Sequence, residues 1–183
     1  WLNRFAELNT VGGNFAKGIE MDYAAVLRPG GKDTKGQMTV DSLILNYGAN
    51  VELDLYGEDA TADHMKIATL KIGKKDWENG PKFLTPVFSI VSHLAAGQEK
   101  LPAGRYLIAE VGKVDGNVAD IAVTGLTGTK AQMVLEGGKL YIEVMGMREP
   151  DEITWTGVNG SVWDLAETEN FKSRGGAAEI FVD

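Results

Sequence analysis

The sequence predicts an all-β protein, and two observations support this fold class. Apolar and polar residues alternate with a period of two, most clearly over 50–56, where Val51, Leu53 and Leu55 lie on one face of a strand and acidic residues on the other. Glycine is also frequent, with 23 glycines in 183 residues, which indicates many sharp turns. Many turns imply many short strands.

Further strands follow from the same alternation. The segment 139–145 repeats the pattern, with Leu140, Ile142 and Val144 on one face and a glycine on either side of the segment. Weaker alternation predicts shorter strands, which in chain order cover 38–40, 43–45, 65–67, 70–72, 87–91, 106–111, 121–123 and 133–135.

The connections carry residues typical of turns. Pro-Gly-Gly at 29–31 predicts a sharp turn, because proline presets φ and glycine accepts positive φ. Asp63 is placed to cap a turn by accepting backbone N–H bonds. Helix formers are confined to 92–96 and to 2–8, where a short helical cap of one or two turns is the most that we expect.

A change of inward parity predicts a bend in the middle of the chain. Ile67 and Leu70 are both expected to face the interior, yet three positions separate them, so strict alternation fails between them. We therefore expect a bend or β-bulge near Ala68 and Thr69.

Strand spacing bears on the architecture. The strand centres Ile67, Phe88 and Ile108 recur about every 20 residues, which is the length of a coil in a parallel β-solenoid. An antiparallel β-sandwich, with a strand about every 8 to 12 residues, is the alternative. The spacing favours the solenoid.

Composition excludes several classes of partner and site. The 26 acidic residues outnumber the 18 basic ones, and the formal charge of -8 argues against nucleic acid as a partner. The absence of cysteine excludes disulfides, thiolate metal sites and a cysteine nucleophile. No run approaches the roughly 18 apolar residues of a membrane helix, so we expect no transmembrane segment.

Several segments, in this order, resemble the autotransporter-associated β-strand repeat of bacterial passenger regions. The first half of the repeat is matched by 27–31 (LRPGG), 36–45 (GQMTVDSLIL), 51–57 (VELDLYG) and 63–67 (DHMKI). Its second half and the opening of a next repeat are matched by 103–108 (AGRYLI), 140–144 (LYIEV), 154–157 (TWTG), 162–164 (VWD) and 170–171 (NF). The resemblance covers about residues 25–183.

The resemblance implies a right-handed parallel β-helix and a role outside the cell. Residues 1–24 would be an N-terminal cap or the end of a preceding repeat, 25–150 a β-solenoid repeat unit, and 151–183 the start of the next unit. The chain would be a noncatalytic segment of a larger protein, secreted or at the outer-membrane surface of a Gram-negative bacterium. It would serve adhesion or display, with host or self surface glycans or proteins as partners.

Polar residues give no clear catalytic, metal or cofactor site. His64 and His93 lack a third ligand at metal spacing, so we interpret them as turn or surface histidines. Four acids could suggest calcium but lack the spacing of a calcium loop, and we expect them to form a solvated edge: Asp54, Glu58, Asp59 and Asp63. We predict no metal and no cofactor.

Aromatic residues near the C-terminus leave a binding alternative. Trp155 and Trp163, near Tyr141 and Phe171 in sequence, would contact glycans if their rings are exposed, although packing at the end of a stack is the favoured role. A polysaccharide lyase or hydrolase is the enzymatic alternative. The sequence lacks the Gly-x-Ser-x-Gly elbow of serine hydrolases, and we predict no catalytic residue.

Overall fold

Short β-strands supply almost all the regular structure of this chain. The computed structural model describes residues 2–73, 85–126, 129–145, 153–160, 170–173 and 178–179, and the chain divides into two units, 1–146 and 147–183. The described residues contain no α-helix and a single turn of 3-10 helix, η1 (Val118–Asp120). The prediction of an all-β protein is confirmed, whereas the helical cap expected over 2–8 is instead a turn followed by a strand.

Two sheets build the unit 1–146. The strands of the larger sheet are, in spatial order, β12 (Ala131–Glu136), β13 (Lys139–Val144), β10 (Gly104–Asp115), β8 (His64–Ile72), β5 (Gln37–Leu45) and β2 (Gly13–Phe15), with β3 (Ile19–Met21) also on β5. The strands of the smaller sheet are β1 (Glu7–Asn9), β4 (Val26–Arg28), β6 (Asn50–Tyr56), β9 (Val87–His93) and β11 (Ala122–Thr124), with β7 (Thr61–Ala62) on β6.

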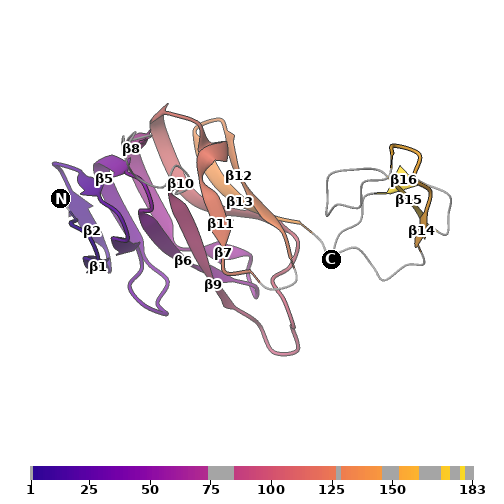
Figure 1. Cartoon of the computed structure of the whole chain (residues 1–183). Coiled ribbons are helices and arrows are strands. Elements are labelled where there is room, and N and C mark those ends of the chain that lie inside the picture. The colour runs from indigo at the N-terminus through magenta and orange to yellow at the C-terminus, as the bar shows by residue number, and fades with distance from the viewer. Residues whose placement is uncertain are drawn as a thin grey trace. The chain divides into compact units, whose positions relative to one another are not determined.

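Pairing is parallel through most of both sheets. From β3 to β6 successive strands alternate between the sheets, and each pairs with a strand of the next pass of the chain. Figure 1 shows the later passes, with β5 beside β8 in one sheet and β6 beside β9 in the other. In the smaller sheet, Val51 of β6 aligns with Leu27 of β4 on one side and with Phe88 of β9 on the other. The direction of pairing differs from that of an antiparallel sandwich, and the two sheets do not close on each other.

Among the described strands of the unit 1–146, antiparallel pairing is confined to a few. In the larger sheet β10 pairs with β13, which in turn pairs with β12. In the smaller sheet the two-residue strand β7 folds back on β6. In the larger sheet, the stacked parallel strands thus end at a β-hairpin formed by β12 and β13, whereas the smaller sheet ends in the parallel strand β11.

The interior is filled by aligned aliphatic side chains. Val51, Leu53 and Leu55 of β6 are fully buried, as their alternation predicts. Each fully buried aliphatic side chain of this size stabilises the fold by about 1.5–3 kcal/mol. Tyr106 is also buried, and its hydroxyl donates a hydrogen bond to the carbonyl oxygen of Pro102 at 3.0 Å, which satisfies its polar atom.

The predicted change of parity falls where it was expected. In β8, Ile67 and Leu70 are buried while Ala68 is exposed and Thr69 half-buried. The register with β5 stays in step on both sides of this point, so the strand bends without an inserted residue. The predicted change of parity is therefore confirmed, and it is a bend without a bulge. We call it the aligned bend, because the strands on either side of it keep the same register.

The strands on either side of β8 change parity at the register position of Ala68. Asp41 is exposed between the inward residues Val40 and Leu43 of β5, as Ala68 is in β8. On the other side, Gly112 of β10 faces Ala68, and a Cβ at this glycine would lie 2.8 Å from the carbonyl oxygen of Ala68. The small residue lets the two backbones approach.

The unit 147–183 contains a small antiparallel sheet. Its strands are β14 (Ile153–Trp155), β15 (Phe171–Ser173) and β16 (Ala178–Glu179). Asn170 is buried at the start of β15, where its backbone carbonyl accepts a hydrogen bond from Thr156 N at 2.7 Å and its side chain one from Asn159 N at 2.8 Å. These bonds tie the turn after β14 to β15.

No helix in the part of the chain that the structure describes has the length and apolar character needed to cross a bilayer.

We expect Leu53→Ala to lower the free energy of unfolding by about 2–5 kcal/mol, because it leaves a cavity between the sheets at a fully buried position. Chemical denaturation followed by circular dichroism measures this change. Val11→Ala is the matched control, since Val11 is 75% exposed and its loss should change stability by less than about 0.5 kcal/mol. Equal effects of the two variants would contradict this assignment of the core.

Candidate functional site

A loop between β4 and β5 covers part of the outer face of the smaller sheet. We call residues 29–36 the covering loop. Its Gly31 has a φ of +88°, as the predicted turn requires. At Gly30 a Cβ would lie 2.1 Å from both Asp63 Oδ1 and the carbonyl oxygen of Thr34, so no side chain fits there. The prediction of a sharp turn at 29–31 is confirmed.

The carboxylate of Asp63 fastens this loop to the sheet. Asp63 is fully buried; its Oδ1 accepts a hydrogen bond from Gly36 N at 2.9 Å, and its Oδ2 accepts one from Asp54 N at 3.0 Å. The predicted role of Asp63 as an acceptor of backbone N–H bonds is confirmed. Its expected place on a solvated acidic edge is wrong, because the covering loop removes it from water.

Asp54 is the second buried carboxylate of the region. It projects from the outer face of β6, as alternation predicts, yet it is only 3% exposed. Its Oδ2 accepts a hydrogen bond from Thr34 N of the covering loop at 3.1 Å, and its Oδ1 lies 2.9 Å from His93 Nε2. The prediction that Asp54 is solvated is therefore wrong, since a segment distant in sequence covers it.

The other two acids of the predicted edge are exposed. Glu58 and Asp59 lie in the turn after β6, and Asp59 forms an ion pair with Lys35 at 3.1 Å. A hydrogen bond from Thr61, and then the ammonium group of Lys35, lower the pKa of Asp59. For these two acids the prediction of a solvated edge is confirmed.

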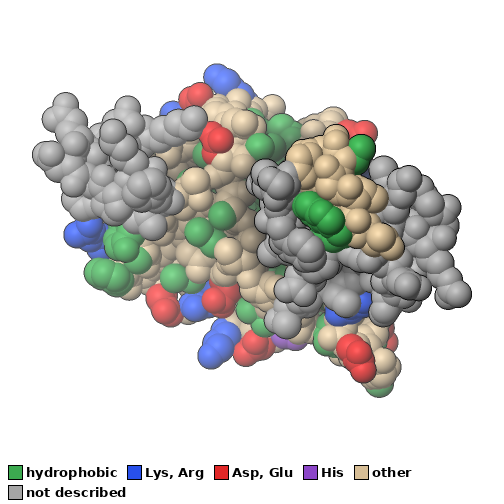
Figure 2. Space-filling view, turned by 45° about the vertical axis from the view of Figure 1, so that its right-hand side comes forward, with side chains coloured by type: hydrophobic (Ala, Val, Ile, Leu, Met, Phe, Trp, Pro, Cys, Tyr) green, Lys and Arg blue, Asp and Glu red, His purple; other side chains and the backbone are tan. Residues whose placement is uncertain are grey.

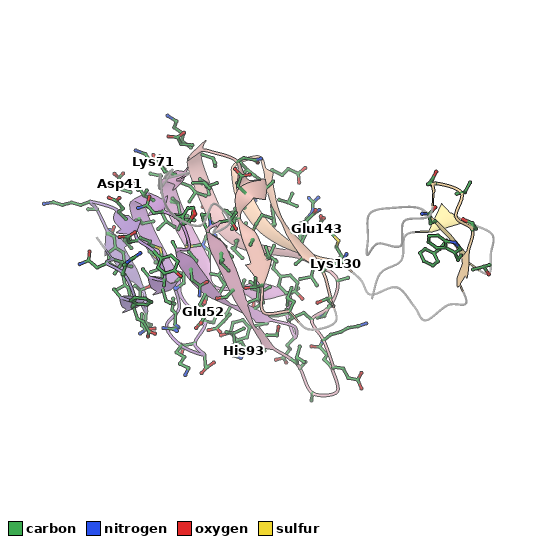
Figure 3. The ribbon with its side chains drawn as sticks, viewed as in Figure 1. Asp41, Glu52, Lys71, His93, Lys130 and Glu143 are labelled. Carbon is green, nitrogen blue, oxygen red and sulfur yellow. The ribbon has the colours of Figure 1, made fainter. Side chains whose placement is uncertain are left out.

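His93 is held in a defined orientation. Its ring stacks on Tyr56 with centroids 4.6 Å apart and planes inclined by 13°, and its Nε2 faces Asp54. Figure 3 shows His93 with Glu52 on one side of the unit 1–146, away from Asp41. His64 lies at the start of β8 in the other sheet, where burial lowers the pKa of its ring. The structure therefore does not bring the two histidines together.

The region is electrostatically negative. Burial, followed by the charges of four nearby carboxylates, raises the pKa of the Tyr56 hydroxyl to about 12. These carboxylates are Asp54, Asp63, Asp33 and Asp59. Burial also raises the pKa of Asp63 to about 6, although two backbone N–H bonds partly stabilise its charge.

Sequence reasoning missed Asp33. It lies in the covering loop at a φ of +54°, and one carboxylate oxygen of Asp33 lies within 4.8 Å of ligand atoms of both Asp54 and His93. These three residues offer two carboxylates and one imidazole, which is a donor set that can hold a metal ion. The pairing of β6 with β9 brings Asp54 near His93, and the covering loop adds Asp33, so local sequence does not indicate this proximity.

A shallow groove of about 740 Å³ crosses the outside of the larger sheet at the aligned bend. Its floor includes the small residues Ala68 and Gly112. Charged residues at aligned positions of three neighbouring strands line the groove: Lys66 of β8 aligns with Glu110 of β10, and Glu110 aligns with Lys139 of β13. Asp41 also lines the groove. On the face drawn in Figure 2, acidic and basic side chains are likewise interspersed.

Of the two tryptophans that would contact glycans, one lies among the described residues. Trp155 is 37% exposed, and its ring meets Phe171 edge-on with centroids 5.1 Å apart. Trp163 lies outside the described residues. Tyr141 belongs to the other unit, where Arg105 lies 5.9 Å from its ring centroid. Of the two tryptophans of the glycan-binding alternative, the structure therefore describes Trp155 alone, and its ring is partly exposed.

The fold and these sites define an all-β protein with two sheets of mainly parallel strands. No family model and no curated protein matches the chain.

The pKa of Asp63 predicts a specific dependence of stability on pH. Because the folded pKa is raised to about 6 from an ordinary value of 3.8, protonation of Asp63 stabilises the fold below pH 3.8, and this contribution is lost as the pH rises through about 6. We expect the free energy of unfolding of the wild type to fall relative to that of Asp63→Asn as the pH rises from 3.8 to about 6. Urea unfolding at a series of pH values measures it.

Asp59→Asn is the control for this pH series. The pKa of Asp59 is lowered, so its contribution is present above its ordinary pKa and lost as the pH falls, opposite in sign to that of Asp63. A pH dependence of the same sign in both variants would contradict the assignment.

Trp155→Ala separates packing from glycan contact. We expect it to lower the free energy of unfolding by about 0.5–3 kcal/mol through loss of the contact with Phe171, with no glycan bound before or after the change. Thermal unfolding and a glycan array are the two measurements. Val158→Ala, at a 73% exposed position of the same unit, is the control. Glycan binding by the wild type that the variant loses would contradict the packing role.

Proposed function

We propose that this chain is a noncatalytic β-solenoid segment of a larger bacterial surface protein and that it works as a scaffold for adhesion or display. The observation that carries the proposal is the pairing of equivalent strands from successive passes. Val26 pairs with Asn50 and Asn50 with Val87, all in parallel. Such stacking satisfies backbone groups between passes and builds a continuous apolar interior.

Ion pairs across neighbouring strands further support a structural role. Arg28 of β4 lies between Glu7 of β1, at 2.9 Å, and Glu52 of β6, to which its Nε donates a hydrogen bond. Residues of three successive passes are thereby joined on the outer face of the smaller sheet. Individually, such partly exposed ion pairs contribute about 0–1 kcal/mol, so they favour correct register more than they add stability.

The proposed family is that of the autotransporter-associated β-strand repeat, with a right-handed parallel β-helix. The matching segments fall on regular features of the chain. The segment 36–45 contains β5, the segment 51–57 covers β6 except its first residue, and 27–31 ends in the turn that the glycines require. We accordingly propose a location outside the cell or at the outer-membrane surface of a Gram-negative bacterium.

Surface exposure tests this proposal directly. An antibody raised against residues 1–146 should label intact cells that produce the whole protein, and external protease should remove that label. A periplasmic marker that is labelled only after permeabilisation controls for leakage. Labelling of the protein only in permeabilised cells would overturn the proposed location and the adhesion or display role.

The groove on the larger sheet favours a second candidate function, namely a polysaccharide-active module. It brings the carboxylates of Asp41 and Glu110 and the amino groups of Lys66 and Lys139 to one surface. Paired carboxylates are the groups that glycoside hydrolysis needs, and lysines suit acidic sugars. Release of reducing ends from a panel of neutral and acidic polysaccharides, abolished by Glu110→Gln, would establish this function in place of the scaffold. We expect no release.

A further inference from the structure

We propose that Asp33, Asp54 and His93 bind one divalent transition-metal ion of the Zn²⁺ or Mn²⁺ type. The site would lie on the outer face of the smaller sheet, beneath the covering loop. The site is separate from the groove, because Asp54 and His93 lie on the smaller sheet and Asp33 in the loop over it, and it does not depend on the scaffold role.

The three ligand atoms converge from three separate parts of the chain. Asp33 comes from the covering loop, Asp54 from β6 and His93 from β9, and one donor atom of each lies within 4.8 Å of the others. An imidazole nitrogen is one of the three donors, which distinguishes the set from a cluster of acidic residues. A mixed nitrogen and oxygen set suits zinc or manganese, whereas calcium takes six to eight oxygen ligands.

The two inner ligands are already in direct contact. Asp54 Oδ1 and His93 Nε2 form a hydrogen-bonded pair 2.9 Å apart, and an ion bound between them would separate the two atoms only slightly, to the roughly 3.3–3.6 Å expected of tetrahedral ligands at about 2.0–2.2 Å from zinc. The second oxygen of Asp54 accepts a hydrogen bond from Thr34 N at 3.1 Å, which fixes the carboxylate. Stacking on Tyr56 fixes the imidazole ring. Both are outer contacts of the kind that orient metal ligands.

The charge balance of the region favours a cation. Asp54 is only 3% exposed. The carboxylate of Asp63, which is also buried, accepts a hydrogen bond from the backbone N–H of Asp54. Asp33 adds a third carboxylate. Lys35, which follows closely in the covering loop, pairs with Asp59 at the exposed rim. A divalent ion would offset the negative charge that these carboxylates concentrate, and buried charges require such compensation.

The ion would join three successive passes of the chain. The covering loop follows β4, and β6 and β9 are the next two strands of the same sheet. A metal ion bonded to all three would oppose their separation and would hold the loop closed. We therefore expect binding to appear as increased thermal stability as well as in direct titration.

The test uses the full chain after treatment with a chelator. Zn²⁺ and Mn²⁺ are titrated in separate calorimetric experiments, and thermal unfolding is followed with and without each ion. We expect one ion per chain and a higher unfolding temperature with at least one of these metals. Asp33→Asn should weaken binding at least tenfold while it leaves the unfolding temperature of the metal-free protein unchanged, because Asp33 is exposed.

Two further variants make the result decisive. Asp59→Asn removes an exposed carboxylate of the same region outside the ligand set and should leave metal affinity within twofold of the wild type. His93→Gln should weaken binding as Asp33→Asn does. The proposal is overturned if neither Zn²⁺ nor Mn²⁺ binds the wild type, if Ca²⁺ stabilises it and these metals do not, or if Asp33→Asn binds as tightly as Asp59→Asn.

Discussion

Parallel pairing between successive passes of the chain is the constraint on which the other features of the unit 1–146 depend. Because β6 pairs in register with β4 and β9, residues at equivalent positions in each pass meet their counterparts. Val51, for example, aligns with Leu27 and Phe88, and all three are buried. Alignment converts a weak two-residue alternation in each segment into a continuous apolar interior, and the area buried there opposes the entropy lost by ordering many short strands.

The same alignment places the two surface features on opposite sheets. On the larger sheet, Ala68 and Gly112 occupy the bend in neighbouring strands, and their small size makes the floor of the groove. On the smaller sheet, the covering loop lies over Asp54 because Asp63 accepts hydrogen bonds from both the loop and β6. Neither feature belongs to one segment alone; each requires adjacent passes held in step.

Local patterns predicted the parts of this arrangement that local chemistry determines. The alternation in 50–56 and 139–145 identified β6 and β13, the Pro-Gly-Gly turn was found at 29–31, and the capping role of Asp63 followed from its position before a strand. The separate strands expected over 38–40 and 43–45 proved to be one strand, β5, because the change of parity between them is a bend. The burial of Asp54 escaped prediction because it depends on a loop from the preceding pass. Asp33 escaped for the same reason.

Gly30 shows how strongly packing restricts one position of the covering loop. A Cβ at this position would lie 2.1 Å from Asp63 Oδ1 and from the carbonyl oxygen of Thr34, and 2.7 Å from Gly36 N, so no other amino acid is compatible with this backbone. Distant relatives that keep the fold should therefore be recognisable by a paired fingerprint, a glycine at this turn together with a buried aspartate in the following pass, even where the rest of their sequences has diverged. Substitutions would accumulate first on outward positions such as Lys66, where the side chain is exposed.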